Sequence, residues 1–402
     1  MHGEARKPGR RCQAMDRAEL RELAAELVRI PSVNPLDGPA EEGRREAEVA
    51  GYVEGRLREA GIECELREAS PGRPSVVARV AGESEEVVWF DAHIDTVSAA
   101  GMAFEPFEGR VEGDTLYGRG AADNKGSVAA MMGAMMAVAK GGSKPAATVV
   151  LTATADEEYR MTGLLGLLES GLTEPRMTAR AAIVGEPTAL EVVVAHKGFS
   201  RFTIATTGKS VHSSRPEEGV NAIYRMGRVV AALEAYAKRG VGRDTHPMLG
   251  KATLSVGVIR GGLHVNVVPD RCEIDVDRRL LPGEEVRRAL NDVRAYLDNA
   301  VEEDVGMEMT GPHLVVPGMN LSSDHELVQA VSAAVREVTG RAPLGGMTGT
   351  THAGPLAEAG IPGVVFGPGP MGQAHTATEE LDLNQLEQAA AVYEALMRSG
   401  CR

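Results

Sequence analysis

The chain has 402 residues, of which 43% are hydrophobic, 25% charged and 3% aromatic. This is an ordinary globular composition, at a length that favours two domains over a single core. Its 57 acidic and 43 basic residues give a formal charge of -14, which argues against a nucleic-acid partner because phosphate binding needs a basic face. No uncharged apolar run of about 18 residues occurs, so we expect no membrane span.

The four cysteines, Cys12, Cys64, Cys272 and Cys401, lie far apart and form no CxxC pair. This spacing indicates neither a disulfide framework nor a zinc finger, and we expect reduced thiols in a cytoplasmic protein. The basic N-terminus has no apolar segment behind it, as a secretory signal would, and residues 1–15 are expected to form a frayed tail.

The first part of the chain alternates predicted helices and strands. A helix is expected from Asp16, a predicted N-cap, to Pro31, and a second from about Glu41 to Ala60. Short runs rich in Val and Ile predict strands at Ser75–Val80, Val87–Phe90, Ala147–Thr152 and Ala181–Val184, with a helix at Ser127–Lys140. This alternation predicts an α/β fold with a mostly parallel sheet flanked by helices.

From about Ala195 the pattern changes to a smaller set of elements. They are strand Phe199–Thr206, helix Gly219–Arg239, strands Ala252–Ile259 and Arg271–Asp277, helix Gly283–Glu302 and strand Gly306–Thr310. The order β-α-β-β-α-β is typical of a ferredoxin-like two-layer domain. The α/β pattern then returns with helix Ser323–Val338, strand Gly363–Gly367 and helix Leu383–Arg398. We therefore expect a large domain at 16–194 and 312–402, with a smaller domain inserted at 195–311.

Acidic and histidine residues follow the predicted strands at equivalent positions. The residues concerned are His93 and Asp95, Glu157 and Glu158, Glu186, and His375, together with Asp123 in the glycine-rich stretch GRGAADNKG ahead of a predicted helix. In a parallel sheet these residues gather beyond the carboxyl ends of the strands, where open α/β folds bind ligands.

Such a set predicts a metal centre, because several carboxylates in one crevice repel one another unless cations neutralise them. Mixed His and Asp/Glu ligation suits Zn²⁺, with Co²⁺ or Mn²⁺ as alternatives. Asp95 is placed to accept the second imidazole N–H of His93, and one Asp is expected to bridge two ions about 3.5–4 Å apart. Taken singly, each residue is more often a turn residue or a solvated charge, so the prediction depends on the combination.

Several stretches resemble the M20 metallopeptidase family, whose members include acetylornithine deacetylases, succinyl-diaminopimelate desuccinylases, aminoacylases and carboxypeptidase G-type enzymes. They are DAHIDTV (91–97), GRGAADNKG (118–126), ATADEE (153–158), GEPT (185–188) and GPG…AHTATE (367–379), with IPSVNP (30–35) similar to the usual opening of the family. The resemblance implies a catalytic domain at 16–194 and 312–402, and a lid and dimerisation domain at 195–311. The activity it implies is hydrolysis of the amide bond of an N-acyl amino acid or a short dipeptide.

The resemblance also implies the roles of the site residues. It implies two divalent ions, one held by His93, Asp123 and Glu186, and the other by Asp123, Glu158 and His375, with Asp123 bridging. Glu157 would be the general base that takes a proton from the attacking water. A non-proline cis peptide after Asp123 is implied as well.

In the inserted domain, KGFSRFTIATTGKSVHSS (197–214) resembles the lid segment of the family. His212 matches a histidine that reaches the active site of a neighbouring subunit and stabilises an oxyanion, which implies a homodimer, most simply with C2 symmetry. Asn266 matches an asparagine that contacts substrate. Arg279 matches an arginine that grips a substrate carboxylate, a role suited to bidentate hydrogen bonding, and Arg278 is the adjacent candidate.

Two departures from the family pattern bear on the substrate. In GMTGTTHAGPLAEAGIP (346–362), His352 stands where desuccinylases carry an Asp and Gly354 where they carry an Arg. Loss of this Arg weakens a desuccinylase interpretation. His352 either binds substrate or is a polar group with another role, and the sequence does not decide between the two. After Glu158, Gly163 comes later than in the EExG pattern of the family.

Two other functions stay open on the sequence. One is an N-carbamoyl amino acid hydrolase on the same scaffold with the same metals. The other is a non-catalytic protein that binds a metal or a small acid, although such a protein would not need Glu157 beside a full ligand set. These motifs do not identify the acyl group or the amine of the substrate.

Overall fold

The computed structural model of the protein describes residues 15–35, 46–171, 179–302 and 305–402. Cys12, most of the predicted N-terminal tail and the predicted helix start at Glu41 lie outside these ranges. The chain divides into two compact units. The larger comprises Met1–Val193, Leu321–Leu344 and Ala359–Arg402, and the smaller comprises Val194–Asn320 and Gly345–Glu358.

The larger unit is built on a mixed sheet with the strand order β1-β2-β6-β3-β7-β16. Strand β3 runs parallel to β6 and β7, and β16 runs parallel to β7. The edge strands differ, because β2 pairs antiparallel with both β1 and β6. The predicted α/β fold is confirmed, with parallel pairing among the central strands. The strands of this sheet are β1 Glu63–Ser70, β2 Arg73–Val80, β3 Ser84–His93, β6 Ala147–Thr154, β7 Ala179–Val184 and β16 Gly363–Val365, and the start of β8 (Val192–His196) joins β16 at Val193.

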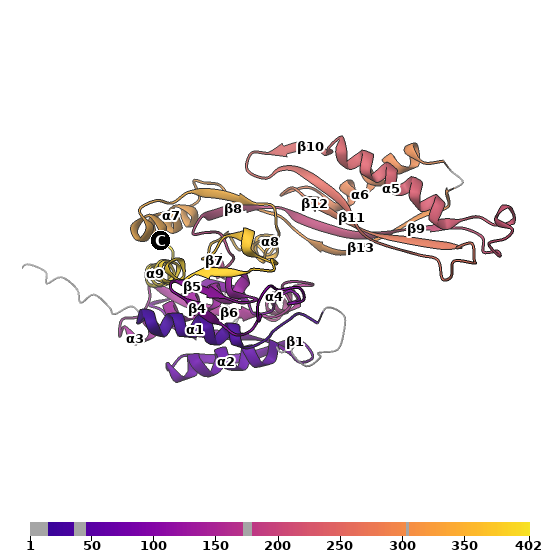
Figure 1. Ribbon diagram of the computed structural model, residues 1–402. Helices are drawn as coiled ribbons and strands as arrows, with labels where there is room; N and C mark the ends of the chain where they lie inside the picture. The colour runs from indigo at the N-terminus through magenta and orange to yellow at the C-terminus, as the bar shows by residue number, and fades with distance from the viewer. Residues whose placement is uncertain (1–14, 36–45, 172–178, 303–304) are drawn as a thin grey trace, which may run out of the picture. The chain divides into compact units, whose positions relative to one another are not determined.

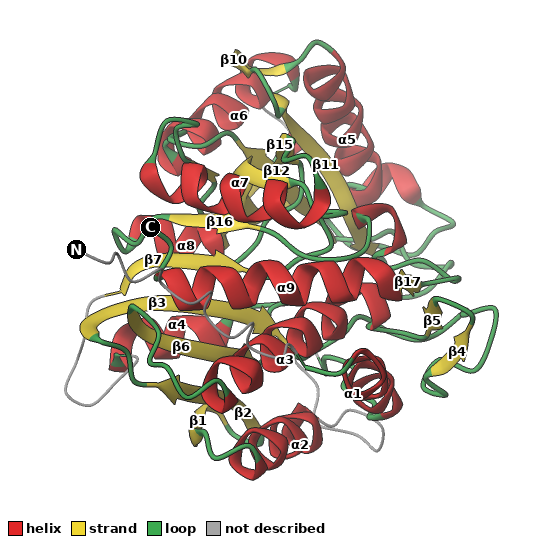
Figure 2. Ribbon diagram, turned by 90° about the vertical axis from the view of Figure 1, so that its left-hand side faces the viewer, coloured by secondary structure: helices red, strands yellow, loops and turns green. Residues whose placement is uncertain are grey.

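The central strands are covered on their faces by helices, which explains the short apolar runs within them. Every residue of β6 is buried, as expected for a strand packed on both sides. Helices α3 and α9 lie side by side across the sheet (Figure 2). The helices are α1 Arg17–Arg29, α2 Glu46–Glu59, α3 Gly126–Lys140, α4 Thr162–Ser170, α7 Glu326–Thr339 and α9 Leu383–Ser399. A small antiparallel sheet in this unit contains β4 Arg110–Glu112, β5 Thr115–Tyr117 and β17 Glu380–Asp382.

The smaller unit contains an antiparallel sheet in the order β10-β11-β12-β9-β13. Helices α5 and α6 pack on one face of it (Figure 1), over a core that includes Phe202, Ile204, Met226 and Val293. The order β9-α5-β11-β12-α6-β13 follows the predicted β-α-β-β-α-β pattern, with β10 added. The elements are β9 Gly198–Thr207, α5 Ala222–Lys238, β10 Val241–His246, β11 Gly250–Gly261, β12 Arg271–Leu280, α6 Val286–Ala300 and β13 Met307–Val316. Further along the chain come β14 Met319–Asn320, β15 Leu344–Met347 and α8 Ala353–Glu358.

Strand β13 continues beyond Gly311, where the sequence pattern predicted the inserted domain to end. Its pairing with β9 shifts register between Thr310 and Leu314, around a cis peptide bond between Gly311 and Pro312. Because proline removes a donor from the ladder, a strand accommodates it at such an irregularity. The pair Gly311-Pro312 therefore interrupts the pairing without ending the strand.

Two further expectations concern thiols and membranes. Cys64, Cys272 and Cys401 are free and buried, in agreement with reduced cysteines. Among the residues that the structure describes, none of the helices combines the length and the apolarity needed to cross a bilayer.

Candidate metal centre

The five predicted metal ligands all belong to the larger unit. His93 is the last residue of β3, and Glu186 comes two residues after β7. Glu158 follows β6, His375 follows β16, and Asp123 lies in the turn before α3. Since β6, β3, β7 and β16 are neighbours that run parallel, their carboxyl ends meet at one edge of the sheet, as expected for a ligand site in an α/β fold.

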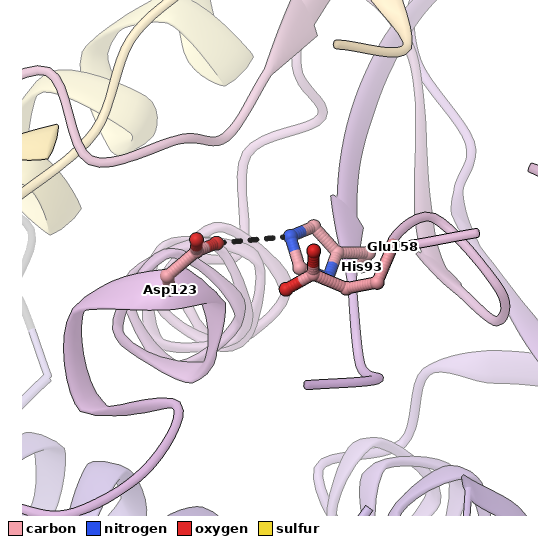
Figure 3. A group of neighbouring side chains, drawn as sticks. All are labelled: His93, Asp123 and Glu158. Carbon is pink, nitrogen blue, oxygen red and sulfur yellow. Dashed lines mark hydrogen bonds and ion pairs between the residues drawn. The ribbon is translucent and has the colours of Figure 1, made fainter. Parts of the chain in front are cut away.

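Asp123 lies between the two imidazoles. Its Oδ1 is 3.1 Å from Nε2 of His93, and its Oδ2 is 3.4 Å from Nε2 of His375 (Figure 3 shows the His93 contact). His375 Nε2 also lies 3.2 Å from Oε2 of Glu158, and His93 Nε2 lies 3.9 Å from Oε1 of Glu186. The two oxygens of one carboxylate thus face two different histidines, each with its own second carboxylate.

Most of the cluster is shielded from solvent, whereas the side chain of His375 is 54% exposed. His93 is 2% exposed, Glu186 5% and Asp123 7%, and the ligand atoms of His93, Asp123 and Glu158 all lie within 4.8 Å of one another. A peptide bond in the cis form, the one implied by the family resemblance, joins Asp123 to Asn124. The Asn124 side chain donates a hydrogen bond to the carbonyl of Gly185, next to Glu186, over 2.5 Å.

Without metal, the surroundings of the cluster favour the protonated form of both histidines. Burial alone would lower the pKa of His93, but hydrogen bonds with Asp123 and Asp95 raise it well above its ordinary value. Hydrogen bonds with Asp123 and Glu158 raise the pKa of His375 to about 10. Burial raises the pKa of Glu186 well above the usual range, against the opposing charge of His93. These shifts all favour proton binding at groups whose charge a cation would otherwise balance.

Asp95 is fully buried and holds the loop that follows β6. Its Oδ1 accepts the backbone N–H of Glu157 over 3.0 Å, and its Oδ2 accepts the backbone N–H of Glu158 over 3.1 Å. His93 directs its Nδ1 at the backbone carbonyl of Asp95, 3.0 Å away, while the Asp95 carboxylate is 3.5 Å away. The residue expected to orient His93 thus does so mainly through its carbonyl, and its carboxylate positions Glu157 and Glu158.

The side chain of Glu157 is half-buried beside the cluster. Its charge contributes to the raised pKa values of both His93 and Glu186, which requires the carboxylate to lie near them. The structure therefore places Glu157 near His93 and Glu186, two of the five predicted ligands.

This loop is also held by three residues to which the sequence assigned no role, namely Asn34, Arg73 and Glu46. Asn34 donates to Oδ2 of Asp95 over 2.7 Å and to Oδ1 of Asp156 over 3.1 Å. Arg73 lies 2.8 Å from Asp156 and pairs with the buried carboxylate of Glu46. Asp156 adopts a left-handed backbone conformation, with φ 67°, which Asp tolerates better than most residues. Asn34 lies in the IPSVNP stretch, which offered a signal, whereas neither Glu46 nor Arg73 belongs to any recognised motif.

Gly163, which comes later after Glu158 than the glycine of the EExG pattern does, is required by close packing. A Cβ atom at Gly163 would lie 2.5 Å from the carbonyl oxygen of Ala155 and 2.7 Å from Oγ of Ser75. Helix α4 therefore begins in direct contact with the end of β6. Between them, the side chain of Asp156 accepts the Oγ1–H of Thr162 over 2.7 Å.

The four predicted substrate and oxyanion residues lie in the smaller unit. His212 forms an isolated bridge with Val267, and its Nδ1 is 2.7 Å from Oγ of Ser214. Asn266 is next to this bridge, and its carbonyl accepts the N–H of Ser213. Both His212 and Asn266 are exposed.

Arg279 is half-buried on β12. Its Nε donates to Asp277 over 2.8 Å, and its guanidinium lies 5.5 Å from the centre of the Phe199 ring. The neighbouring Arg278 is 1% exposed and is paired with Glu284. Arg279 is thus the more accessible of the two candidate arginines.

The segment that departs from the desuccinylase pattern also belongs to the smaller unit. His352 is 1% exposed, at the start of α8. A Cβ atom at Gly354 would lie 2.0 Å from the carbonyl oxygen of Pro317. The backbone therefore leaves no room for the arginine that desuccinylases carry at this position.

The donor set fits a metal centre on chemical grounds. Two imidazoles and three carboxylates are the ligand types that Zn²⁺ and related divalent ions prefer. Without a cation, several buried acidic groups would lie within a few ångströms of one another. The larger unit is therefore an α/β protein with a metal-type ligand cluster at the strand ends, the arrangement of a metal-dependent hydrolase.

Comparison with known proteins identifies the family. The model of peptidase family M20/M25/M40 matches residues 89–399. The acetylornithine deacetylase of Myxococcus xanthus is 32% identical over 364 residues, which cover 87% of this chain and 91% of that protein. The chain therefore belongs to the M20 peptidase family, and it is a hydrolase.

Solved structures agree on the fold. The M20 family metallo-carboxypeptidase Sso-CP2 of Sulfolobus solfataricus aligns with a TM-score of 0.76 at 19% identity, over 96% of this chain and 99% of that chain. The YXEP protein of Bacillus subtilis, a dinuclear metal binding peptidase from the M20 family, aligns with a TM-score of 0.68 at 20% identity, over 95% of this chain and 97% of that chain.

Proposed function

We propose that the protein is a metal-dependent deacylase or peptidase that cleaves the amide bond of an N-acyl amino acid or a short dipeptide. The observation that carries this proposal is the position of Asp123, whose two carboxylate oxygens face His93 and His375 separately. The similarity to an acetylornithine deacetylase favours a small N-acetylated amino acid among these substrates.

Two divalent ions, most simply Zn²⁺, are proposed for the site. His93, Asp123 and Glu186 would hold one, and Asp123, Glu158 and His375 the other. Contacts of 3.1–3.4 Å from Asp123 to the two imidazoles support a bridging role for this carboxylate. When bound, such ions act as Lewis acids that make water more nucleophilic near neutral pH and polarise the scissile carbonyl.

Glu157 is proposed as the general base. It takes a proton from the attacking water and passes it to the leaving amine, a transfer that requires a carboxylate near the ligands but not consumed by them. The two hydrogen bonds from the Glu157 and Glu158 N–H groups to Asp95 support this assignment, because they fix the backbone from which both carboxylates extend. A protein that only bound metal would not need Glu157.

Residues of the smaller unit are proposed to complete the reaction. His212 would stabilise the oxyanion in the active site of a second subunit, Asn266 would contact substrate, and Arg279 would bind a substrate carboxylate. His352 is retained as a substrate-binding candidate, although it is buried. The cytoplasmic location expected from the cysteine spacing stays a prediction.

The role proposed for His212 requires a second subunit, so we propose that the protein forms a homodimer through the smaller unit. Large apolar side chains are exposed near His212, with Val265 101%, Leu263 89% and Tyr224 77% exposed. They line a hollow of about 710 Å³ together with Ser213 and neighbouring residues. Exposed apolar groups on this scale are typical of a contact surface, and a closed C2 pair is the simplest arrangement.

The proposal is tested by removing metal and by a substrate panel. Strong chelator should abolish hydrolysis, and Zn²⁺, Co²⁺ or Mn²⁺ should restore it. The panel contains N-acetyl, N-succinyl and N-carbamoyl amino acids and dipeptides, assayed with metal content measured in parallel. Preference for N-carbamoyl substrates would select the alternative hydrolase. Activity retained in strong chelator, or no hydrolysis of any panel member by the metal-loaded protein, would overturn the proposal.

A further inference from the structure

Glu379 lies at the end of the AHTATE stretch and has no role in the site as proposed so far. Its side chain is 0% exposed, and its carboxylate is surrounded by donors from the turn that carries Asp123. Oε1 accepts the N–H of Ala122 over 3.1 Å and the N–H of Asp123 over 2.9 Å. Oε2 accepts the N–H of Gly120 over 3.1 Å and the Nη1–H of Arg119 over 2.5 Å.

Arg119 extends this arrangement to the segment that carries His375. Its side chain is buried, with Nη2 donating to the carbonyl of Thr376 over 3.1 Å and Nε to the carbonyl of Ser98 over 3.2 Å. The backbone adds a further link, because the N–H of Gly118 donates to the carbonyl of Glu379 over 3.2 Å. The turn at 118–123 and the segment at 375–379 are therefore joined by several hydrogen bonds that all involve Glu379 or Arg119.

The turn at 118–123 carries Asp123, and the segment at 375–379 carries His375. The distance between these two side chains matters for a pair of ions that Asp123 would bridge. Asp123 lies between the imidazoles of His93 and His375, and its own backbone N–H is held by Glu379. His375 is four residues before Glu379 in the chain. A shift of the 118–123 turn would therefore move the bridging carboxylate with respect to His375.

We propose that Glu379 is a positioning residue that sets the distance between Asp123 and His375, and with it the affinity of the site for divalent ions. This inference rests on the proposed metal-dependent function. Groups that orient metal ligands from behind typically change metal affinity or activity by about 10- to 100-fold when they are replaced. A carboxylate is needed here because only a fully ionised group offers acceptors on both oxygens to four converging donors.

A purely structural role is the competing explanation. Removing one partner of any buried ion pair destabilises a protein, because the other charge is left without compensation. The two explanations differ in what they predict for metal binding. A structural role predicts loss of thermal stability alone, whereas a positioning role predicts a loss of affinity that exceeds the loss seen for a comparable ion pair elsewhere.

The test substitutes Glu379→Gln, which preserves the shape of the side chain. The amide nitrogen of Gln would face one pair of the N–H donors, so the turn must shift. The matched control is Glu387→Gln in α9, where the carboxylate is 11% exposed and pairs with Nε of Arg21 over 2.7 Å. The measurements are the dissociation constants of Zn²⁺ and Co²⁺ for the metal-free full chain, the visible spectrum of the bound Co²⁺, and the melting temperature without metal.

We expect Glu379→Gln to weaken binding of both ions by about 10- to 100-fold and to alter the Co²⁺ spectrum, with Glu387→Gln unchanged in both. Unchanged affinity and spectrum in Glu379→Gln would overturn the inference while leaving the proposed function intact. Failure of the unsubstituted chain to bind either ion would instead overturn the proposed function, and the inference with it.

A second variant covers the case in which Glu379→Gln does not fold. Arg119→Lys keeps a positive charge beside Glu379 but loses the fork that also reaches the carbonyl of Thr376. Weakened metal binding in Arg119→Lys supports the same inference, and unchanged binding contradicts it.

Discussion

The carboxylate of Asp95 accepts a hydrogen bond from the backbone N–H of Glu157 over 3.0 Å. The same residue receives Nδ1 of His93 at its backbone carbonyl, and a carbonyl is only an acceptor, so Nδ1 carries a proton. Nε2 of His93 is then the nitrogen directed at Asp123. One buried residue thus fixes the tautomer of a proposed ligand and the backbone of the proposed base.

Asp95→Asn should reduce either metal affinity or kcat by about 10- to 100-fold. Asn keeps one acceptor oxygen, so its amide nitrogen must face the N–H of Glu157 or of Glu158. Metal content and kcat measured on the purified variant check this expectation. Asp114→Asn, at an exposed ion pair with Arg21, is the control and should change neither quantity. If metal content and kcat are the same in Asp95→Asn and in the unsubstituted chain, Asp95 does not position the ligands or the base.

Glu157→Gln should retain metal and lose turnover. A general base contributes about 10²- to 10⁴-fold to the rate, so kcat should fall within that range while the metal dissociation constants stay the same. Glu158→Gln is the informative partner, because it alters a proposed ligand and should weaken metal binding. If Glu157→Gln keeps full turnover, or if it releases metal as Glu158→Gln does, the assignment of the base is wrong.

Metal binding should release protons from the cluster. In the metal-free protein the pKa of His375 is raised to about 10 and that of His93 well above its ordinary value, so both imidazoles keep their protons to higher pH than a free histidine does. A metal binds only neutral imidazole, so protons must leave these rings when it binds. Apparent affinity should therefore rise as pH increases from 7 towards about 10. Calorimetry of Zn²⁺ binding in two buffers of different ionisation enthalpy measures the proton count, and a count of zero at pH 8 would contradict this prediction.

Much of the fold and the candidate site could be predicted from the sequence because the signals were local. Strands β3, β6 and β7 each contain a short buried apolar run, and the acids and histidines of the site lie close after these runs in the sequence. Parallel pairing then places those residues at one edge. Asp16 was also predicted correctly as the N-cap of α1, where its side chain accepts the N–H of Ala18.

The parts that sequence reasoning missed depend on contacts between distant segments. The hydrogen bonds of Glu379 cross more than 250 positions of the chain, and no local pattern specifies them. Short strands such as β4, β5 and β17, of three residues each, exist because they pair with one another. The Asp95 carboxylate was expected at His93, but the turn of the chain after β3 brings the carbonyl closer.

Gly354→Ala should destabilise the protein. A Cβ atom here would lie 2.0 Å from the carbonyl oxygen of Pro317 and 3.1 Å from Cε1 of His196, and forced overpacking of this kind costs about 1–3 kcal/mol. Gly349→Ala is the matched control in the same segment, since its nearest neighbour would be Sδ of Met347 at 3.5 Å. Urea unfolding of both variants checks the difference. Equal stability would mean that the segment can move, and that an arginine grip could be introduced at position 354.

Acid should destabilise the protein through His196. This side chain is 0% exposed, its Nδ1 lies 2.9 Å from the carbonyl of Lys197, and its Nε2 has no hydrogen-bond partner among the described residues. Burial lowers the pKa of His196 to about 4, whereas an unfolded histidine titrates near about 6.5.

Between these two values the unfolded chain binds a proton that the folded chain does not, so the free energy of unfolding falls as pH falls. The contribution is complete above about pH 6.5 and is lost progressively towards about pH 4. The loss amounts to about 3 kcal/mol in full, of which about 2 kcal/mol is already lost at pH 5. Urea unfolding at pH 7 and pH 5 should therefore show a smaller loss for His196→Gln, which cannot titrate, than for the unsubstituted chain. His264→Gln, at an exposed position, is the control. An identical pH dependence in His196→Gln and the unsubstituted chain would show that His196 takes up its proton in the folded state as readily as in the unfolded one.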